Sequence, residues 1–469
     1  MLPMKFLKAI FLLVLPMMML MSAGTESSAP KKKYPGKKTY MFRVQLRDKS
    51  GTPYSLARPS AYLSQKAIER RARQHIAIDS TDLPVSMQYE KMLEKQGTSV
   101  VSKSKWNNTV VVMTTDTLAV NRLKLLPFVV GVRKVWTSPD SITLEKPRPQ
   151  YHKELVLHDT VDVDSHGATQ EQLAMLGGQT LHSQGYRGKG MTIAVLDAGF
   201  TNADLIPAFI NANIVGFQDF VVPSRSKMFN SSTHGTQVLS TMAVNVPDVY
   251  VGAAPEASYW LLRCEDQQSE QPVEEDYWAA AAEYADSVGV DVINSSLGFY
   301  EYDNPADSYH YWQQDGKTAL ISRTASMLAG KGIVHVNSCG NEGMVAWKKI
   351  SFPSDATDIL SVGAVTPMRK NASFCSLGPS ADGRVKPDVM AQGSPTMVVT
   401  ERGTISSDMG TSFASPLIAG MTACLWQKFP SMTALQLMDM IRRSGSNVAH
   451  PDNVYGYGIP DFGSIRGDE

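Results

Sequence analysis

Five short apolar runs, rich in β-branched residues, are the feature that most constrains how this chain can fold. They span residues 191–199, 257–264, 291–298, 332–341 and 359–365. Stretches of helical composition, residues 277–289 and 321–332, separate some of them. Buried strands that alternate with helices predict an α/β domain, in which helices cover both faces of a parallel sheet. Functional sites in such sheets gather at the carboxyl ends of the strands.

A smaller α+β unit is predicted ahead of this sheet, over residues 40–136. It begins with a strand, MFRVQL, and continues with two helical faces and a pair of strands around Trp106. A further helix near residues 118–125 and a last strand, VVGVRKVW, complete it. The polar, proline-containing stretch 137–167 predicts a linker, and residues 168–469 are expected to form the main domain.

The first 24 residues have the pattern of a secretory signal peptide. Lys5 and Lys8 precede an apolar run, residues 9–21, and small residues follow it up to Gly24. The alternative is an uncleaved membrane anchor. Pro16 interrupts the run, which is also shorter than the roughly 20 residues that span a bilayer. We therefore expect an exported protein without a membrane anchor after cleavage; periplasm, cell surface and medium are not distinguished.

Charge and cysteine content exclude some classes of function. The 45 basic and 45 acidic residues balance, which gives no reason to expect a nucleic-acid partner. A basic cluster at residues 31–38 is interpreted as a flexible, solvated arm rather than a binding patch. The four cysteines form no C-x-x-C pair, so no zinc site is predicted. Whether they are free thiols or disulfides is left open.

Two candidate catalytic residues follow apolar elements of the main domain. Asp197 comes directly after the apolar run MTIAVL, where a buried carboxylate needs a partner. His234 lies where a polar loop becomes an apolar helix, and Gly235 leaves room beside it. Taken singly, each has an ordinary structural explanation: a turn residue for Asp197, and a helix-start residue for His234.

Two more candidates lie further along the chain. Asn341 stands between glycines in GNEG, where a sharp turn would present its amide as an uncharged donor for an oxyanion. In MGTSFASPLIAG, Ser412 begins a buried helix, where free backbone N–H groups and the helix dipole meet. Ser415, one turn further, is expected to pack and bond locally. Alternative interpretations are a turn residue for Asn341 and a membrane helix for the uncharged stretch from residue 409 to 427.

Together these four residues supply the parts of an acyl-transfer enzyme. Asp197 would orient a base, His234 would be that base, and Ser412 the nucleophile. Asn341 would donate to the oxyanion. The stretch around Ser412 lacks the second glycine of the G-x-S-x-G elbow, so an α/β-hydrolase is not predicted.

At this point the sequence resembles the subtilases, the subtilisin-like serine proteases, from about residue 185 to 460. The resemblance rests on six matches in the order of the family, of which the serine motif is the most specific. They are Asp197-Ala-Gly, His234-Gly-Thr, Gly252-Ala-Ala-Pro255, Asp291-Val-Ile-Asn-Ser-Ser-Leu-Gly298, Gly340-Asn-Glu-Gly343 and Gly410-Thr-Ser-Phe-Ala-Ser-Pro416. It implies the same four catalytic roles, with the Ser412 N–H as second oxyanion donor.

The resemblance also implies where a polypeptide substrate binds. Its extended backbone would pair with Ser296, Leu297 and Gly298, and residues 336–339 would form a wall of the pocket for the residue before the cleaved bond. Three departures stand out: Ala198 and Gln237 replace a hydroxyl and a second histidine of many relatives, and Cys339 adds bulk near the pocket, which leaves its preference open. The long aromatic stretch 299–318 is expected to shape the groove.

By its layout, the unit at 40–136 resembles the family's propeptide, a folding aid and intramolecular inhibitor. This implies a zymogen cleaved between residues 137 and 167, and we expect a monomer that needs no cofactor. Relatives commonly bind structural calcium; because no carboxylate-rich loop here matches, calcium is left open. The main rival is a catalytically silent binding protein of the same fold. A peptide ligase or an exopeptidase would use the same residues, whereas the acid-active Ser-Glu-Asp relatives would require Glu in place of His234.

Overall fold

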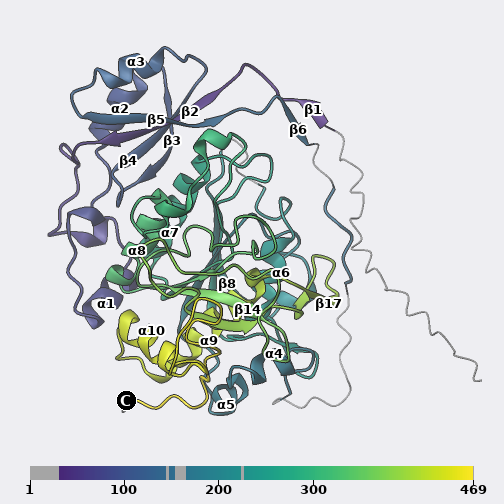
Figure 1. Ribbon diagram of the computed structural model, residues 1–469. Helices are drawn as coiled ribbons and strands as arrows, with labels where there is room; N and C mark the ends of the chain where they lie inside the picture. The colour runs from purple at the N-terminus through teal and green to yellow at the C-terminus, as the bar shows by residue number, and fades with distance from the viewer. Residues whose placement is uncertain (1–30, 144–146, 154–164, 223–226, 468–469) are drawn as a thin grey trace, which may run out of the picture.

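The computed structural model describes residues 31–143, 147–153, 165–222 and 227–467 (Figure 1). The expected signal peptide, residues 1–24, and parts of the expected linker lie outside these ranges. A small unit at the N-terminal side packs against one end of a larger α/β domain. No helix among the described residues is long and apolar enough to cross a membrane.

The N-terminal unit is a four-stranded antiparallel sheet with helices, as its pattern predicts. The strand order is β3-β4-β2-β5, and the helices α1, α2 and α3 lie between the strands in sequence. The elements are β2 (Tyr40–Leu46), α1 (Gln65–Arg73), α2 (Met87–Glu94), β3 (Ser99–Ser104), β4 (Thr109–Thr114), α3 (Ala119–Lys124) and β5 (Val129–Thr137). Val44, Val110 and Leu93 are among the residues that form its separate apolar core.

The main domain is built on a seven-stranded parallel sheet, which confirms the predicted fold class. The strand order is β15-β14-β13-β12-β7-β11-β8. The strands are β7 (Thr192–Asp197), β8 (Asn213–Asp219), β11 (Ser258–Arg263), β12 (Val292–Ser295), β13 (Val334–Ser338), β14 (Leu360–Val365) and β15 (Val389–Gln392). The sequence predicted five of these; β8 and β15 are additional, and they form the two borders of the sheet.

Successive side chains of the central strand β7 point to opposite faces and enter different cores. Ile193 and Val195 pack on the side of α9 (Thr411–Lys428), whereas Ala194 and Leu196 pack on the side of α7 (Val273–Val288). Both faces of the sheet are therefore covered. The other helices are α4 (Gln170–Ala174), α5 (Gly178–Ser183), α6 (His234–Ala243), α8 (Leu320–Met327) and α10 (Ala434–Arg443).

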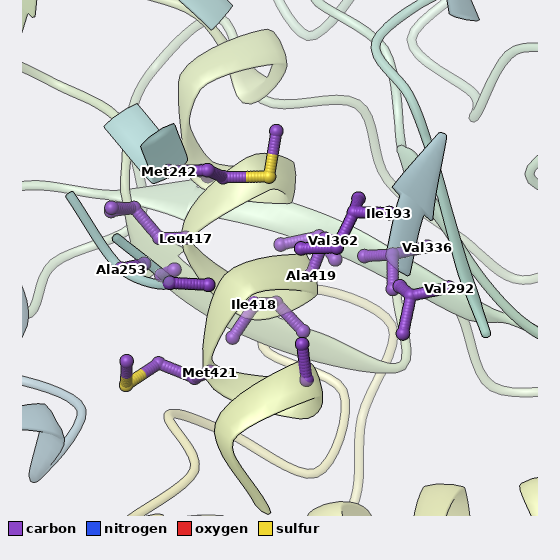
Figure 2. Packing of buried hydrophobic residues seen from close by; sticks show 14 of the residues in the cluster. Ile193, Met242, Ala253, Val292, Val336, Val362, Leu417, Ile418, Ala419 and Met421 are labelled. Carbon is purple, nitrogen blue, oxygen red and sulfur yellow. The ribbon is translucent and has the colours of Figure 1, made fainter. Parts of the chain in front are cut away.

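Helix α9 is apolar on every side because it runs through the core. Residues 411–426 are all buried. Figure 2 shows Ala419 of this helix beside Val362 of the sheet, and Leu417 on the side of Met242 and Ala253. A Cβ at Gly420 would come within 2.5 Å of the Ala253 Cβ, so only glycine permits this approach. The uncharged stretch is thus a buried central helix, as predicted, and not a membrane span.

Three two-stranded antiparallel sheets complete the strands of the described residues. They are β1 (Lys31–Lys33) with β6 (Ser141–Thr143), β9 (Asn245–Val246) with β10 (Tyr250–Val251), and β16 (Thr396–Val399) with β17 (Ile405–Asp408). The lysines of β1 are exposed, but they pair with β6. The expectation of a flexible arm was therefore wrong for residues 31–33, because their backbone groups find partners beyond β5.

A buried network of charges joins the N-terminal unit to the main domain. Arg70 and Arg71 of α1 both contact the Asp286 carboxylate of α7, at 2.5 and 2.8 Å, and all three side chains are at most 1% exposed. Nearby, the Glu283 carboxylate accepts the backbone N–H of Lys105 at 2.7 Å and of Trp106 at 3.0 Å. Buried charges need such partners, so the docking geometry is specific.

Candidate active site

Asp197 is the last residue of β7, and its side chain is fully buried. The position follows from the sequence: a continuous apolar strand carries the carboxylate into the interior, where the chain must turn. One carboxylate oxygen accepts the Ala198 backbone N–H at 2.8 Å. The Ala198 carbonyl is itself held by the Ser231 hydroxyl at 2.8 Å and by Arg263 at 3.0 Å. The loop that carries the acid is therefore fixed from three sides.

His234 is the first residue of α6 and faces this carboxylate. Its Nδ1 lies 2.9 Å from Asp197 Oδ2 and 3.0 Å from Oδ1. A Cβ at Gly235 would lie 3.0 Å from the Asp197 Cβ, so the missing side chain lets the helix start come this close. The imidazole is 31% exposed, which leaves its other nitrogen accessible.

The surrounding charges favour the protonated imidazole. Burial lowers the pKa of His234, but the Asp197 carboxylate, its hydrogen bond, and the charges of Glu265 and Asp408 outweigh burial and raise the pKa to about 9. The pKa of Glu265 is raised to about 7, first by burial and then by Asp197. As a base, His234 must be neutral, so its full capacity is reached only in alkaline solution.

Ser412 lies at the start of α9 and is 8% exposed. Pro416, four residues further, has no N–H to bond to the Ser412 carbonyl. That carbonyl accepts instead from the Ser296 hydroxyl at 2.8 Å. In return, the Ser412 hydroxyl donates to the Ser296 carbonyl at 3.3 Å. The serine is held beside residues 296–298, which continue β12 beyond the sheet; Gly298 is exposed, whereas Ser296 and Leu297 are buried.

Asn341 is oriented by the residue that precedes the serine. Its Oδ1 accepts from the Thr411 backbone N–H at 3.0 Å and from the Thr411 hydroxyl at 2.9 Å. These two bonds fix the orientation of the amide group, and its NH2 makes no hydrogen bond to another described residue. Asn341 is exposed, so this donor is available to a ligand.

The four predicted residues all lie at this end of the sheet. The rings of His234 and Phe413, the neighbour of Ser412, have centroids 5.9 Å apart, which brings the base beside the start of α9. Ser415 points elsewhere: its hydroxyl donates to Asn294 Oδ1 at 2.8 Å, inside the core. The arrangement offers a hydroxyl, an imidazole with a carboxylate behind it, and an amide donor, which suits acyl transfer.

Two functional contacts were not predicted. Thr411 was only part of a motif, and its hold on Asn341 depends on residues 70 positions apart meeting in space. Ser232, which accepts the His234 backbone N–H at 3.2 Å and the Gln267 side chain at 3.1 Å, was also missed. The motif Thr-Ser offered a signal for Thr411, whereas nothing in the sequence marked Ser232.

Part of the aromatic stretch 299–318 packs inward, whereas Tyr311 and Trp312 are exposed. Tyr302 is 3% and Tyr309 8% exposed, and the ring centroid of Tyr309 lies 4.3 Å from that of Phe352. Tyr300 stacks on Trp347 at 4.9 Å. The stretch thus supports the segment around Phe352, and its effect on a groove stays a prediction.

The described residues contain neither a disulfide nor a cluster of side chains that could hold a metal ion. All four cysteines are buried and free. Within residues 31–143, 147–153, 165–222 and 227–467, no group of three or more His, Cys, Asp or Glu side chains is placed to hold a metal ion.

Two family models match the chain. The model described as "Subtilase family" matches residues 188–458, which contain all four candidate catalytic residues. The model described as "Peptidase S8 propeptide domain, Bacteroidota" matches residues 41–151, which include the small N-terminal sheet. The two matches do not overlap and follow the two units of the structure.

Curated relatives match the larger unit. Subtilisin NAT from Bacillus subtilis subsp. natto and subtilisin E from Bacillus subtilis (strain 168) are each 30% identical over 289 residues, which are 61% of this chain and 68% of the relative. Subtilisin from Bacillus pumilus is 29% identical over 290 residues, 94% of its length.

Proposed function

The chain belongs to the subtilase family, as a subtilisin-like serine endopeptidase with a propeptide, and from this premise we propose that Ser412 is its nucleophile. His234 is the general base, and Asp197 orients and stabilises it. The observation that carries this proposal is the 2.9 Å contact between His234 Nδ1 and the buried Asp197 carboxylate at the strand end. It fixes the ring so that Nε2 is the nitrogen that serves the hydroxyl.

The proposed reaction proceeds by acyl transfer. His234 accepts the proton of Ser412 as Oγ attacks the carbonyl carbon of the substrate, and the imidazolium then protonates the leaving amine. The tetrahedral oxyanion accepts hydrogen bonds from the Asn341 amide and from the Ser412 N–H at the helix start. Water releases the acyl group by the same steps in reverse order. The protein itself supplies the nucleophile, the base and the oxyanion donors, so we propose no cofactor for the chemistry.

The proposed substrate is a polypeptide in extended conformation. Residues 296–298 continue β12 past the last paired residue, and Gly298 is exposed, so a substrate backbone could pair there as an added strand. Such pairing recognises the peptide backbone and not one particular side chain. We propose that the chain acts as a monomer, because its site is complete within one chain.

We further propose that the N-terminal unit inhibits the enzyme until the chain is cleaved between residues 137 and 167. The segment after β5 supports this. Thr137 bonds to the Gln271 side chain at 2.8 Å and Thr143 to the Gln268 side chain at 2.8 Å, in the loop that also contacts Ser232. Further on, Arg148 pairs with Asp204, in the loop after Asp197, at 3.0 Å. The described parts of the connecting chain thus contact loops that adjoin the candidate site, which supports the proposal.

Export by a signal peptide is part of the same proposal. The apolar run that supports it lies within residues 1–24, and an inactive precursor would protect the producing cell before export. Mass spectrometry of the protein recovered outside the cytoplasm gives its first residue, which tests the predicted cleavage near Ala23 or Gly24 and the second one between residues 137 and 167.

A fluorophosphonate probe together with a long peptide tests the function directly. We expect the wild type to be labelled on Ser412 and to cleave internal bonds of the peptide. A protein that is neither labelled nor active would be the catalytically silent alternative, and release of terminal residues alone would identify an exopeptidase. For the precursor, Ser412→Ala is purified in the absence of other proteases. If this variant were still trimmed between residues 137 and 167, cleavage by its own active site would be ruled out.

A further inference from the structure

Two backbone segments lie beside Ser412, and we call the position between them the slot. β12 and β13 are neighbours in the sheet up to the pair Ser295 and Asn337, and beyond it the two chains leave the sheet. The first, residues 296–298, bonds to Ser412 in both directions. The second, residues 338–340, is joined to the same helix start, since the Gly340 N–H donates to the Thr411 hydroxyl at 3.3 Å. Both walls of the slot therefore flank the nucleophile.

Ser351 and Phe352 form the floor of this slot. The Ser351 N–H donates to the Cys339 carbonyl at 3.0 Å, on one wall. The backbones of Phe352 and Phe299 exchange two hydrogen bonds, at 2.8 and 2.9 Å, just beyond the other wall. Phe352 is fully buried and packs against Tyr309. Because the floor is bonded on both sides and packed from behind, it cannot easily move aside.

The side chain of Ser351 stands inside the slot. A Cβ placed on Gly298 would overlap the Ser351 hydroxyl and lie 2.8 Å from the Ser351 Cβ. A Cβ placed on Gly340 would lie 2.9 Å from the same hydroxyl. The hydroxyl thus lies near both glycines, one from each wall; on the side of Gly340, the side chains of Glu342 and Ser376 also occupy the space that the missing side chain leaves.

The Ser351 hydroxyl is also an unusual polar group. Ser351 is 1% exposed, and its Oγ has no hydrogen-bond partner within the described residues. Buried hydroxyls are nearly always paired, and leaving one unpaired is unfavourable. A small polar group that entered the slot from the side of Ser412 would supply the missing partner.

We infer that Ser351 restricts the residue on the amino side of the cleaved bond, the P1 residue, to Gly, Ala or Ser. This inference rests on the proposed function. When the P1 carbonyl carbon is at Ser412 Oγ and its oxygen at the Asn341 amide, the P1 side chain enters between residues 296–298 and 338–340. There it meets the Ser351 hydroxyl. A methyl or hydroxymethyl group fits above the hydroxyl, whereas a Leu or Phe side chain would have to displace a floor that is bonded to both walls.

The test uses the processed enzyme and four peptide p-nitroanilides that differ only at P1, which is Ala, Ser, Leu or Phe. For the wild type we expect kcat/KM to be higher for Ala and Ser than for Leu and Phe. Ser351→Gly removes both the hydroxyl and the Cβ, and it should raise the Phe-to-Ala ratio of kcat/KM by about 10- to 100-fold. Ser351→Ala should give an intermediate ratio, and Ser351→Thr a lower ratio than the wild type.

Ser361→Ala is the matched control. Ser361 is likewise fully buried with a hydroxyl that has no partner within the described ranges, but it lies in β14, outside the slot. It should leave the Phe-to-Ala ratio unchanged. Active-site titration with the fluorophosphonate normalises each variant to its folded fraction. If Ser351→Gly does not fold, the P1 preference of the wild type and the ratios of Ser351→Ala and Ser351→Thr still test whether Ser351 restricts P1.

Two results would overturn the inference while the proposed function stands. The first is an active wild type that prefers Leu or Phe at P1. The second is a Phe-to-Ala ratio of kcat/KM that is the same in the wild type and in the Thr, Ala and Gly variants of Ser351. A wild type that neither reacts with the probe nor cleaves any of the peptides would instead refute the proposed function, and the inference with it.

Discussion

Ser412 and Ser296 hold each other by two hydrogen bonds in opposite directions. The Ser412 hydroxyl donates to the Ser296 carbonyl at 3.3 Å, and the Ser296 hydroxyl donates to the Ser412 carbonyl at 2.8 Å. The second bond is possible because Pro416 cannot supply an N–H to that carbonyl. The long first bond is the one that Ser412 must give up when its hydroxyl turns to His234. The start of the helix is thus held firmly while the reacting atom is held weakly.

Replacing the two serines of the motif should separate chemistry from packing. Ser412→Ala should lower kcat by about 10⁶-fold, the magnitude known for the corresponding change in subtilisin. Ser415→Ala loses one hydrogen bond to Asn294 and should lower the free energy of unfolding by about 1 kcal/mol, with a much smaller effect on kcat. Peptide hydrolysis and denaturant unfolding measure the two effects. Equal losses of activity in the two variants would contradict the assignment.

The pKa of His234 predicts an alkaline pH profile. Because the neutral imidazole is the base and its pKa is about 9, kcat/KM should rise with pH and level off only above about 9. Glu265→Gln removes a negative charge that raises this pKa, so its profile should be displaced to lower pH. A profile that levels off below pH 7 in the wild type would show that the pair does not titrate as the geometry indicates.

The same pair links stability to pH with a defined sign. The pKa of His234 is higher in the folded chain, about 9, than the value of about 6.5 expected when unfolded. The folded state therefore binds the proton more tightly, and the contribution of the Asp197–His234 pair is fully present below about pH 6.5 and is lost as pH rises through 9. In Asp197→Asn this dependence should become much smaller, because Asp197 is the largest of the charges that raise the pKa of His234. Unfolding of wild type and variant in a Ser412→Ala background, between pH 6 and 10, measures it.

Replacing Asn341 should lower kcat and leave KM nearly unchanged. Asn341→Ala should lower kcat by about 10²- to 10³-fold with little change in KM, the range known for the corresponding donor in subtilisin. Thr411→Val removes the hydroxyl that accompanies the backbone N–H on Asn341 Oδ1, so it should give a smaller loss of kcat. If Asn341→Ala raised KM and left kcat unchanged, the amide would bind the substrate in the ground state and not the oxyanion.

The buried charge network predicts which arginine fixes the N-terminal unit. Arg70→Ala leaves the fully buried Asp286 without one of its partners and should lower the free energy of unfolding of the Ser412→Ala precursor by about 3–5 kcal/mol. Arg73, on the same helix, has a 41% exposed side chain 3.5 Å from Asp291, and Arg73→Ala should cost at most about 1 kcal/mol. Denaturant unfolding compares them. Similar losses would mean that the network does not anchor the unit.

The four buried thiols should resist alkylation in the folded protein. Burial raises the pKa of Cys264, Cys339 and Cys424, so little reactive thiolate is present at neutral pH. Cys339 and Cys375 have their sulfur atoms 3.5 Å apart, without a bond. Mass spectrometry after treatment with iodoacetamide should find no label before unfolding and four labels after it. Rapid labelling of the native protein would show that one of these sites opens.

Local patterns in the sequence were sufficient to predict the central strands and the buried helix, and to select candidate catalytic residues at their ends. Continuous apolar runs ending in Asp197 and in GNEG predicted central strands, because burial on both faces requires them. The uncharged stretch after Met409 predicted a buried helix with Ser412 at its start. These residues could be assigned catalytic roles because each role needs a particular functional group at the end of an element, and the motif order agreed. β8 was missed because most of its residues are exposed or half-buried at the border of the sheet, and β15 because it is a buried strand of only four residues.

Only the tertiary structure decided which atoms meet. The sequence placed Asp197 and His234 37 residues apart, and their contact depends on α6 approaching β7 over Gly235. It suggested a pocket near Cys339 but not that Ser351, from a separate loop, fills the space between two glycines. Its interpretation of residues 31–33 was wrong, since β6 lies more than 100 positions away. The short-range periodicity of a sequence indicates which residues are buried and whether a segment is a helix or a strand. Contacts between distant segments depend on tertiary packing, which no local pattern contains.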